Sequence, residues 1–92
     1  MKILLSNHHL LTYAGTEIYT YTLAKFLKIS GHNVTIYSHY LGNIKSDFEK
    51  LGVEIYSDIE QLTSHHFDIA HVHHNINLFE NRYHFPNLPI EN

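Results

Sequence analysis

Short apolar runs alternate with helix-forming segments along this chain, and this alternation is the feature that most limits what the chain can fold into. The first unit joins a continuous apolar run at residues 3–6 to a helix predicted over residues 16–30. A run of this kind is typical of a strand buried on both faces. Repeated alternation of strands and helices favours an α/β domain, in which a Rossmann-like parallel sheet carries helices on both faces.

The helix over residues 16–30 has start and stop signals in the sequence. Thr16 is a suitable N-cap residue, and Glu17 places a carboxylate in the first turn, where the helix dipole favours negative charge. Gly31 is suited to end the helix because glycine accepts the left-handed conformation. The large apolar side chains of the helix fall on one face, which we expect to pack on the sheet. These side chains are Tyr19, Leu23, Phe26 and Leu27.

The remaining segments extend the same pattern. We predict strands over 34–38, 53–56 and 67–73, short helices over 44–51 and 58–62, a helix or turn over about 76–84, and the start of a fifth strand at 88–90. Asp58 is expected to cap the second of the short helices. Two short crossovers lead outward from the first strand, so the usual strand order is 3-2-1-4. The topological switch point then lies between strands one and four, and the outer edge of strand four is left exposed.

Ligands of such sheets bind beyond the carboxyl ends of the strands at the switch point. In this chain the loops there are predicted over residues 7–15 and 73–77. The first loop leads into a helix N-terminus, where backbone amides can bind an anion. Gly15 has no side chain, so it leaves these amides accessible. The candidate binding residues are therefore His8, His9, Gly15, Thr16, Glu17, His73, His74 and Asn75. Two plainer alternatives stay open: Gly15 only relieves strain in a turn, and Glu17 is a helix-start residue without a catalytic role.

Charge and composition exclude several functional classes. The six Lys and Arg residues are scattered and the formal net charge is −3, so a nucleic-acid partner is not expected. No cysteine is present, so no disulfide can cross-link the fold. No apolar run approaches the ~20 residues of a membrane span, and the first apolar run is too short for a signal peptide. We therefore expect a cytoplasmic protein with no transmembrane segment and no cofactor.

Ten histidines invite a metal-binding interpretation. His71 and His73 are two residues apart and share one face of a strand, and the pair at residues 8–9 could lie across the switch point from them. Zinc sites use such ligands, but no cysteine and no suitably spaced glutamate accompany these histidines. We expect no metal site, and we expect His73 and His74 to be polar lining of a cleft. A histidine zinc site, tested by metal uptake that His73→Ala abolishes, is the alternative.

Five motifs follow one another in an order and spacing that resemble a known family. They are Gly15-Thr16-Glu17, Gly31-His32-Asn33-Val34-Thr35, Gly52-Val53-Glu54-Ile55, Phe67-Asp68-Ile69-Ala70-His71-Val72-His73 and Asn87-Leu88-Pro89-Ile90. The pattern is similar to the N-terminal domain of a GT-B glycosyltransferase, and more narrowly to the retaining glycosyltransferase family 4 group. The resemblance covers essentially all of residues 1–92, which would form an incomplete GT-B N-terminal domain.

The resemblance implies two Rossmann-like domains that face each other across a cleft and bind different substrates. The C-terminal domain of such enzymes holds most contacts to the nucleotide-sugar donor, and the N-terminal domain shapes the side of the carbohydrate or lipid-linked acceptor. By resemblance, Gly15 and Thr16 approach the donor phosphates and His73 lines the cleft. Ala14 departs from the pattern, because members often carry a second glycine there, and alanine restricts the backbone. A position peripheral to the inner face of the membrane is compatible with such an enzyme.

The resemblance also implies that the chain is a fragment that does not turn over alone. The family histidine near the reacting sugar follows strand five, and the paired glutamates and basic residues that bind the donor lie in the second domain. The alternative is a stand-alone α/β module that binds a nucleotide or a protein without catalysis. In either case the exposed edge of strand four predicts self-association.

Overall fold

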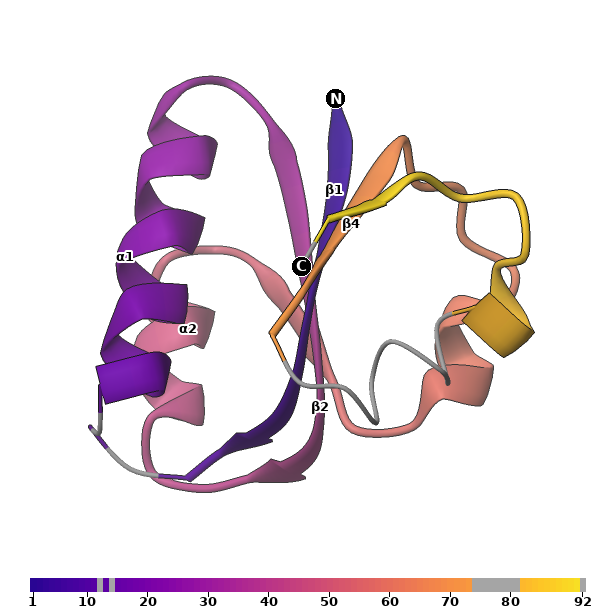
Figure 1. Ribbon diagram of the computed structural model, residues 1–92. Coiled ribbons are helices and arrows are strands. Elements are labelled where there is room, and N and C mark those ends of the chain that lie inside the picture. Colours follow the sequence, from indigo (N-terminus) through magenta and orange to yellow (C-terminus); the bar gives the residue numbers. More distant parts are fainter. Residues whose placement is uncertain (12, 14, 74–81, 92) are drawn as a thin grey trace.

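A five-stranded parallel sheet forms the centre of the structure, a computed structural model that describes residues 1–11, 13, 15–73 and 82–91 (Figure 1). Its strands are β1 (Lys2–Leu10), β2 (Asn33–Leu41), β3 (Glu54–Tyr56), β4 (Ile69–Val72) and β5 (Ile90–Glu91). Their spatial order is β3-β2-β1-β4-β5, and every pairing is parallel. The predicted α/β class and the order 3-2-1-4 are therefore confirmed, with the switch point between β1 and β4.

Helical elements cover both faces of this sheet. Helices α1 (Gly15–Ile29) and α2 (Lys45–Lys50) lie on one face, and the 3-10 helix η1 (Ile59–Leu62) packs on the other (Figure 1). The predicted cap of η1 is confirmed, because the Asp58 side chain accepts a hydrogen bond from the Glu60 N–H at 3.0 Å. Within the described residues, no helix has the combined length and apolarity that a membrane crossing requires.

The end of α1 follows the predicted glycine stop. Gly31 has φ 93°, and its N–H donates to the Lys28 carbonyl at 3.0 Å. The His32 N–H donates to the Leu27 carbonyl at 3.1 Å. These two bonds form a Schellman motif, which satisfies carbonyls that the end of a helix would otherwise leave unbonded.

Alternating residues of the strands divide the core into two layers. Ile3 and Leu5 of β1 pack under α1 and α2 with Phe48, whereas Leu4 points to the opposite face and packs near Leu62 of η1. Successive side chains of a strand point to opposite faces, so a run that is apolar throughout serves both layers. The short apolar run at residues 3–6 is therefore a strand buried on both sides, as predicted.

The first strand is longer than the sequence predicts. Residues 7–10, predicted as part of a loop, continue β1 and pair with the end of β2 through Leu10 and Leu41. Asn7 is buried, and its side-chain amide donates to Thr20 Oγ1 at 3.0 Å. A polar side chain is tolerated in a buried strand when a partner satisfies it, and hydrophobicity alone does not show that partner.

The prediction for the face of α1 that packs on the sheet is correct for Leu23 and Leu27, which pack against the core, and wrong for Tyr19 and Phe26. Tyr19 and Phe26 are more than half exposed, while Glu17, Thr20 and Ala24 are buried against the sheet. The cause lies in the strands beneath, where polar Asn7 and Ser38 occupy buried paired positions at the carboxyl ends of β1 and β2. A polar side chain such as Thr20 meets this surface better than a large aromatic ring does.

The edge of β4 also differs from its prediction. β4 begins at Ile69 rather than at residue 67, and β5 pairs with it at Ala70↔Ile90 and His71↔Glu91. The prediction of an uncovered β4 edge is therefore wrong, because the predicted fifth strand does form. Self-association through the edge that remains stays a prediction. Of the helix or turn predicted over about 76–84, residues 82–84 are helical and residues 76–81 lie outside the described part of the chain.

Asp68 joins the amino ends of β4 and β1. Its carboxylate accepts a hydrogen bond from the Lys2 N–H at 2.7 Å, and its own N–H donates to the Lys2 carbonyl at 2.7 Å. The ring of His66 lies 3.5 Å from the same carboxylate. The bond from the Lys2 N–H lowers the pKa of Asp68, and the charges of His66 and the N-terminus act in the same direction.

This lowered pKa predicts a pH-dependent contribution to stability. The unfolded state binds the proton more tightly than the folded state, so the contribution is complete above the unfolded pKa of about 3.9 and is lost as the pH falls through the folded pKa. We expect Asp68→Asn to lower the melting temperature at pH 6, with a difference from wild type that shrinks toward pH 3. Thermal unfolding between pH 3 and pH 6 tests this prediction. Glu49→Gln, which removes an exposed carboxylate on α2, is the control. A difference that does not change with pH would contradict it.

Candidate functional site

The carboxyl ends of β1 and β4 are offset at the switch point. β4 pairs with β1 as far as Ser6↔Val72, and the His73 N–H then donates to the Ser6 carbonyl at 3.0 Å. β1 continues beyond this point to Leu10 beside β2. The offset produces a step at the edge where ligands of doubly wound sheets bind. We call this region, between the end of β4 and the start of α1, the switch-point site.

The N-terminus of α1 opens toward this edge. Gly15 is the first residue of the helix and is exposed, as is Thr16. A Cβ atom at Gly15 would meet nothing within 4 Å, and its φ is not positive. The alternative in which Gly15 relieves a strained turn therefore has no support in its backbone conformation. What a glycine provides here is open space next to a helix N-terminus.

Glu17 is buried rather than directed into the site. Only 1% of its surface is exposed. Its carboxylate accepts hydrogen bonds from the Leu11 N–H at 3.2 Å and from the Thr16 hydroxyl at 3.4 Å. The Glu17 carboxylate therefore links the residue after β1 to the first turn of α1. Its negative charge also offsets the positive end of the helix dipole. This geometry agrees with the simpler interpretation of Glu17 as a helix-start residue.

Two residues that the sequence prediction missed fix α1 against β1. Thr20 accepts the hydrogen bond from the Asn7 amide and donates its own hydroxyl proton to the Thr16 carbonyl at 2.9 Å. This chain of bonds runs from the strand to the first turn of the helix and sets where Gly15 lies. A polar residue directly after an apolar strand, followed by threonine in a helix, is the signal that could have found them.

An aromatic surface borders the site on the β4 side. The rings of Tyr19 and His73 are stacked, with centroids 5.0 Å apart and planes 19° apart. His71 lies next to them, 5.3 Å from His73 and 6.4 Å from Tyr19. Both histidines are half-buried and Tyr19 is half exposed, so the group presents an aromatic surface to solvent. His71 and His73 do share one face, as their spacing predicts.

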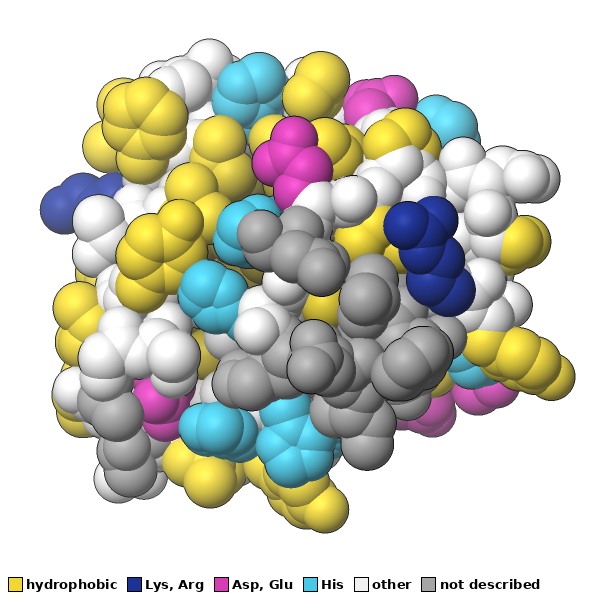
Figure 2. Space-filling view, viewed as in Figure 1, with side chains coloured by type: hydrophobic (Ala, Val, Ile, Leu, Met, Phe, Trp, Pro, Cys, Tyr) yellow, Lys and Arg dark blue, Asp and Glu magenta, His cyan; other side chains and the backbone are white. Residues whose placement is uncertain are grey.

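A second group of imidazoles lies at the ends of β1 and β2. His8 is 5.2 Å from His39 and 5.7 Å from His9, between ring centroids, and 5.4 Å from Tyr40. Figure 2 shows histidine side chains at the lower edge of the molecule, where β1 and β2 end in Figure 1. His8 and His9 were predicted in a loop and are strand residues instead, because β1 extends to Leu10.

The metal interpretation gains no support from the geometry. Among residues 1–11, 13, 15–73 and 82–91, no three His, Asp or Glu side chains are placed to hold a metal ion. The two imidazole groups lie in different places: one is on β1 and β2, and the other is at the end of β4 beside α1. His74 and Asn75, also predicted as binding residues, lie outside the described part of the chain.

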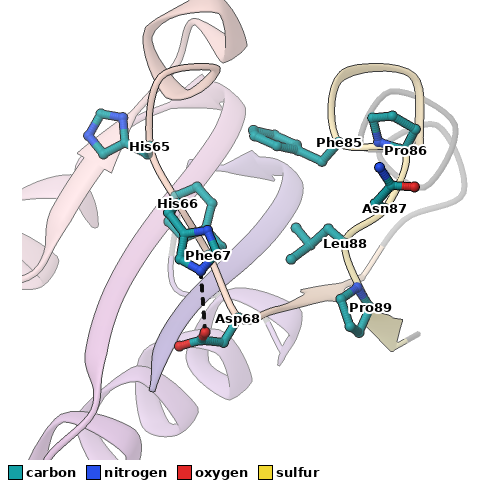
Figure 3. A pocket seen from close by; sticks show the side chains of 9 residues that line it. All are labelled: His65, His66, Phe67, Asp68, Phe85, Pro86, Asn87, Leu88 and Pro89. Carbon is teal, nitrogen blue, oxygen red and sulfur yellow. Dashed lines mark ion pairs between the residues drawn. The ribbon is translucent and has the colours of Figure 1, made fainter.

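A separate cavity lies at the amino end of β4, on the edge opposite the switch-point site. It has a volume of about 380 Å³ and is bordered by Phe67, Phe85 and Leu88, with His66 and Asp68 paired at its rim (Figure 3). The rings of Phe67 and Phe85 meet edge to face at 5.9 Å. This position is not where parallel sheets bind their ligands, and His65 and His66, which line the cavity, are remote from the switch point.

Lys and Arg are absent from the part of the sequence that forms the β1 and α1 side of the switch-point site. Residues 6–23 include no Lys or Arg, and their single carboxylate, that of Glu17, is buried. Among the described residues, the groups near the site include hydroxyls, an amide, imidazoles and one exposed tyrosine ring, and Glu91 of β5 pairs with His71. Comparisons with protein-family models, curated proteins and solved structures each found no match to this chain.

Proposed function

We propose that this chain is the acceptor-side domain of a GT-B glycosyltransferase, an enzyme that transfers a sugar from a nucleotide-sugar donor to a glycan, lipid or other acceptor. The switch-point site is then the place where the acceptor sugar binds. The observation that carries the proposal is the combination of the Tyr19–His73 stack with hydroxyl, amide and imidazole hydrogen-bonding groups. A sugar ring has an apolar face that suits an aromatic surface and a rim of hydroxyls that suits imidazole, amide and backbone groups.

The charges near α1 favour a neutral ligand over a phosphate. A helix N-terminus attracts anions, but the buried carboxylate of Glu17 offsets this attraction within the first turn. No Lys or Arg between residues 6 and 23 compensates that charge. Donor phosphates would then take their positive partners from elsewhere in the enzyme. This supports an acceptor role for the domain more than it supports the phosphate role that the resemblance assigns to Gly15 and Thr16.

The proposal divides the chemistry between this chain and the rest of the enzyme. His73 offers an imidazole to an acceptor hydroxyl, and its stack on Tyr19 restricts how the ring can turn. Electrostatic stabilisation of the departing diphosphate, the main catalytic contribution in such a transfer, requires cationic or dipolar groups outside this site. The chain alone is therefore a binding domain that positions one substrate and does not turn over.

A saccharide titration of the ¹⁵N-labelled chain tests this proposal. We expect a neutral disaccharide such as maltose or cellobiose to shift the amides of Tyr19, His73 and Gly15, with a Kd of about 1–10 mM, which corresponds to about 3–4 kcal/mol. His73→Ala should weaken binding by about tenfold, or ~1.4 kcal/mol. His32→Ala, which removes an imidazole at the opposite edge of the sheet, is the matched control and should leave the Kd unchanged. Binding of UDP alone, indifferent to His73→Ala, would contradict the proposal.

The stand-alone module remains the second candidate because both faces of the sheet are covered within this chain. The two core layers, together with β5 on the edge of β4, are what an independent domain needs. Thermal unfolding combined with size-exclusion mass, with and without millimolar UDP or GDP, separates the candidates. A cooperative monomer stabilised by nucleotide would favour the module, because a ligand raises stability only when it binds the folded state. A broad transition that nucleotide does not move would favour the enzyme domain.

A further inference from the structure

A second pocket lies at the carboxyl edge of the sheet, between the starts of α1 and α2, which lie side by side on one face (Figure 1). We call it the tyrosine pocket. Parallel sheets bind their ligands at this edge. The lining residues follow the ends of β1 and β2 or belong to α1, and they are Tyr13, Ile18, Tyr21, Ile44 and Asp47.

The walls of the tyrosine pocket are held in place without a ligand. Ile44 is 1% exposed and belongs to the core layer beneath α1 and α2. The ring of Tyr21 meets buried Phe48 edge to face, with centroids 5.5 Å apart. The Tyr13 hydroxyl donates to Asp47 Oδ2 at 2.6 Å, and this bond ties the connection before α1 to the first turn of α2. A pocket formed in advance avoids the cost of ordering its side chains when a ligand binds.

Hydrogen-bond acceptors dominate the polar part of the pocket. Tyr13 gives its proton to Asp47, so the positions left on this pair are lone pairs of the hydroxyl and carboxylate oxygens. The bond to Asp47 raises the pKa of Tyr13, so the hydroxyl keeps its proton at neutral pH. A ligand must therefore supply the donors. The described residues that line the pocket include no Lys, Arg or His to balance an anion, which argues against a phosphate.

The size of the pocket and its apolar part limit the ligand further. Its volume is about 230 Å³, below the ~300–1,000 Å³ of sites for drug-sized ligands, so the occupant is a single ring or a group of that size. Tyr13 is 58% exposed and Ile18 is 43% exposed, so both present apolar surface to the occupant. A sugar ring combines this size with an apolar face and hydroxyl donors. Ile18 precedes Tyr19, so a rotation of about 100° around α1 separates the pocket from the Tyr19–His73 stack.

We propose that the tyrosine pocket binds a further sugar ring of the acceptor, which is then an oligosaccharide that extends from the Tyr19–His73 stack past the start of α1. This inference rests on the proposed function, because the switch-point site holds the first part of the same acceptor. Each place alone binds weakly, but a sugar chain that reaches both gains affinity because its second contact is intramolecular. An organic cation would also suit the Asp47 carboxylate, but continuity with the switch-point site favours the sugar.

Neutral sugars of two lengths, titrated into the ¹⁵N-labelled chain, test this proposal. The probes are maltose with maltotetraose, and cellobiose with cellotetraose. In the series that binds, we expect the tetrasaccharide to have a Kd about tenfold below that of the disaccharide and to add shifts at the amides of Tyr13 and Asp47. Tyr13→Ala and Asp47→Ala should each remove most of this gain. Glu54→Ala is the matched control and should keep the gain, because Glu54 accepts a bond of the same 2.6 Å from the Tyr56 hydroxyl on β3.

The outcomes distinguish failure of this inference from failure of the proposed function. A tetrasaccharide that binds no more tightly than its disaccharide, or a gain that survives both Tyr13→Ala and Asp47→Ala, overturns the inference alone. Absence of binding by every sugar counts against the proposed function, and the inference falls with it. Asp47→Asn retains a carbonyl acceptor, so it should keep most of the gain. A loss as large as that of Asp47→Ala would mean that the carboxylate charge is required, which would overturn the sugar in favour of a cation.

Discussion

Gly42→Ala is expected to lower the free energy of unfolding by about 3 kcal/mol, the upper end of what overpacking costs. A Cβ atom at this position would overlap the Leu11 carbonyl oxygen and lie 2.8 Å from the Leu11 Cα. Both are backbone atoms, so no side-chain rotation can relieve the overlap. The same two segments are joined by hydrogen bonds from the Gly42 N–H to the Leu10 carbonyl at 2.8 Å and from the Asn43 N–H to the Leu11 carbonyl at 3.1 Å. Separation of the segments would weaken both bonds.

Thermal unfolding of paired glycine variants measures this effect. For a domain of this size 1 kcal/mol corresponds to about 4–8 °C, so Gly42→Ala should melt roughly 12–24 °C below wild type. Gly15→Ala is the matched control, because a Cβ there meets nothing within 4 Å and the residue begins a helix. It should melt at the wild-type temperature or slightly above it, since alanine restricts the unfolded chain. Equal melting temperatures for the two variants would contradict the close approach of residues 11 and 42.

The strand order followed from the sequence because several signals agreed. The apolar run at residues 3–6, the glycine stop at Gly31 and the cap at Asp58 each predicted one local structure, and each formed there. Alternation of elements then limits the topology to a parallel sheet with a switch point beside the first strand. Prediction failed at residues 7–10, where polar side chains continue β1. The hydrogen-bond partner of the Asn7 side chain comes from a helix thirteen residues further along the chain, and no local pattern contains that information.

The orientation of α1 could not have been predicted from its hydrophobic pattern. The helix has apolar residues on two sides, so periodicity alone does not decide which side meets the sheet. The strands decide it, because Asn7 is buried beneath the helix and bonds Thr20. Of the candidate site, Gly15 and His73 lie where they were predicted, at the start of α1 and directly after β4. The stack of His73 on Tyr19 was missed because Tyr19 was expected in the core.

Glu17→Ala is expected to lower the free energy of unfolding by about 2–4 kcal/mol. Loss of the carboxylate leaves the part-buried Leu11 N–H without its acceptor, which costs about 1–3 kcal/mol, and the vacated space at a residue that is 1% exposed adds to this. Glu17→Gln keeps a carbonyl oxygen for the Leu11 N–H and removes a buried charge, so it should stay within about 1 kcal/mol of wild type. Urea unfolding at pH 7 measures both variants. A Gln variant as unstable as the Ala variant would show that the charge itself is required.

The same pair of variants tests why the start of α1 favours a neutral ligand. If the Glu17 carboxylate offsets the helix dipole, Glu17→Gln should bind inorganic phosphate or UDP severalfold more tightly than wild type while its affinity for a neutral disaccharide stays the same. Amide shifts of Gly15 and Thr16 report both titrations at one place. Unchanged affinity for both anions would mean that the carboxylate does not control what binds there. In that case the absence of Lys and Arg from residues 6–23 alone would account for the preference for a neutral ligand.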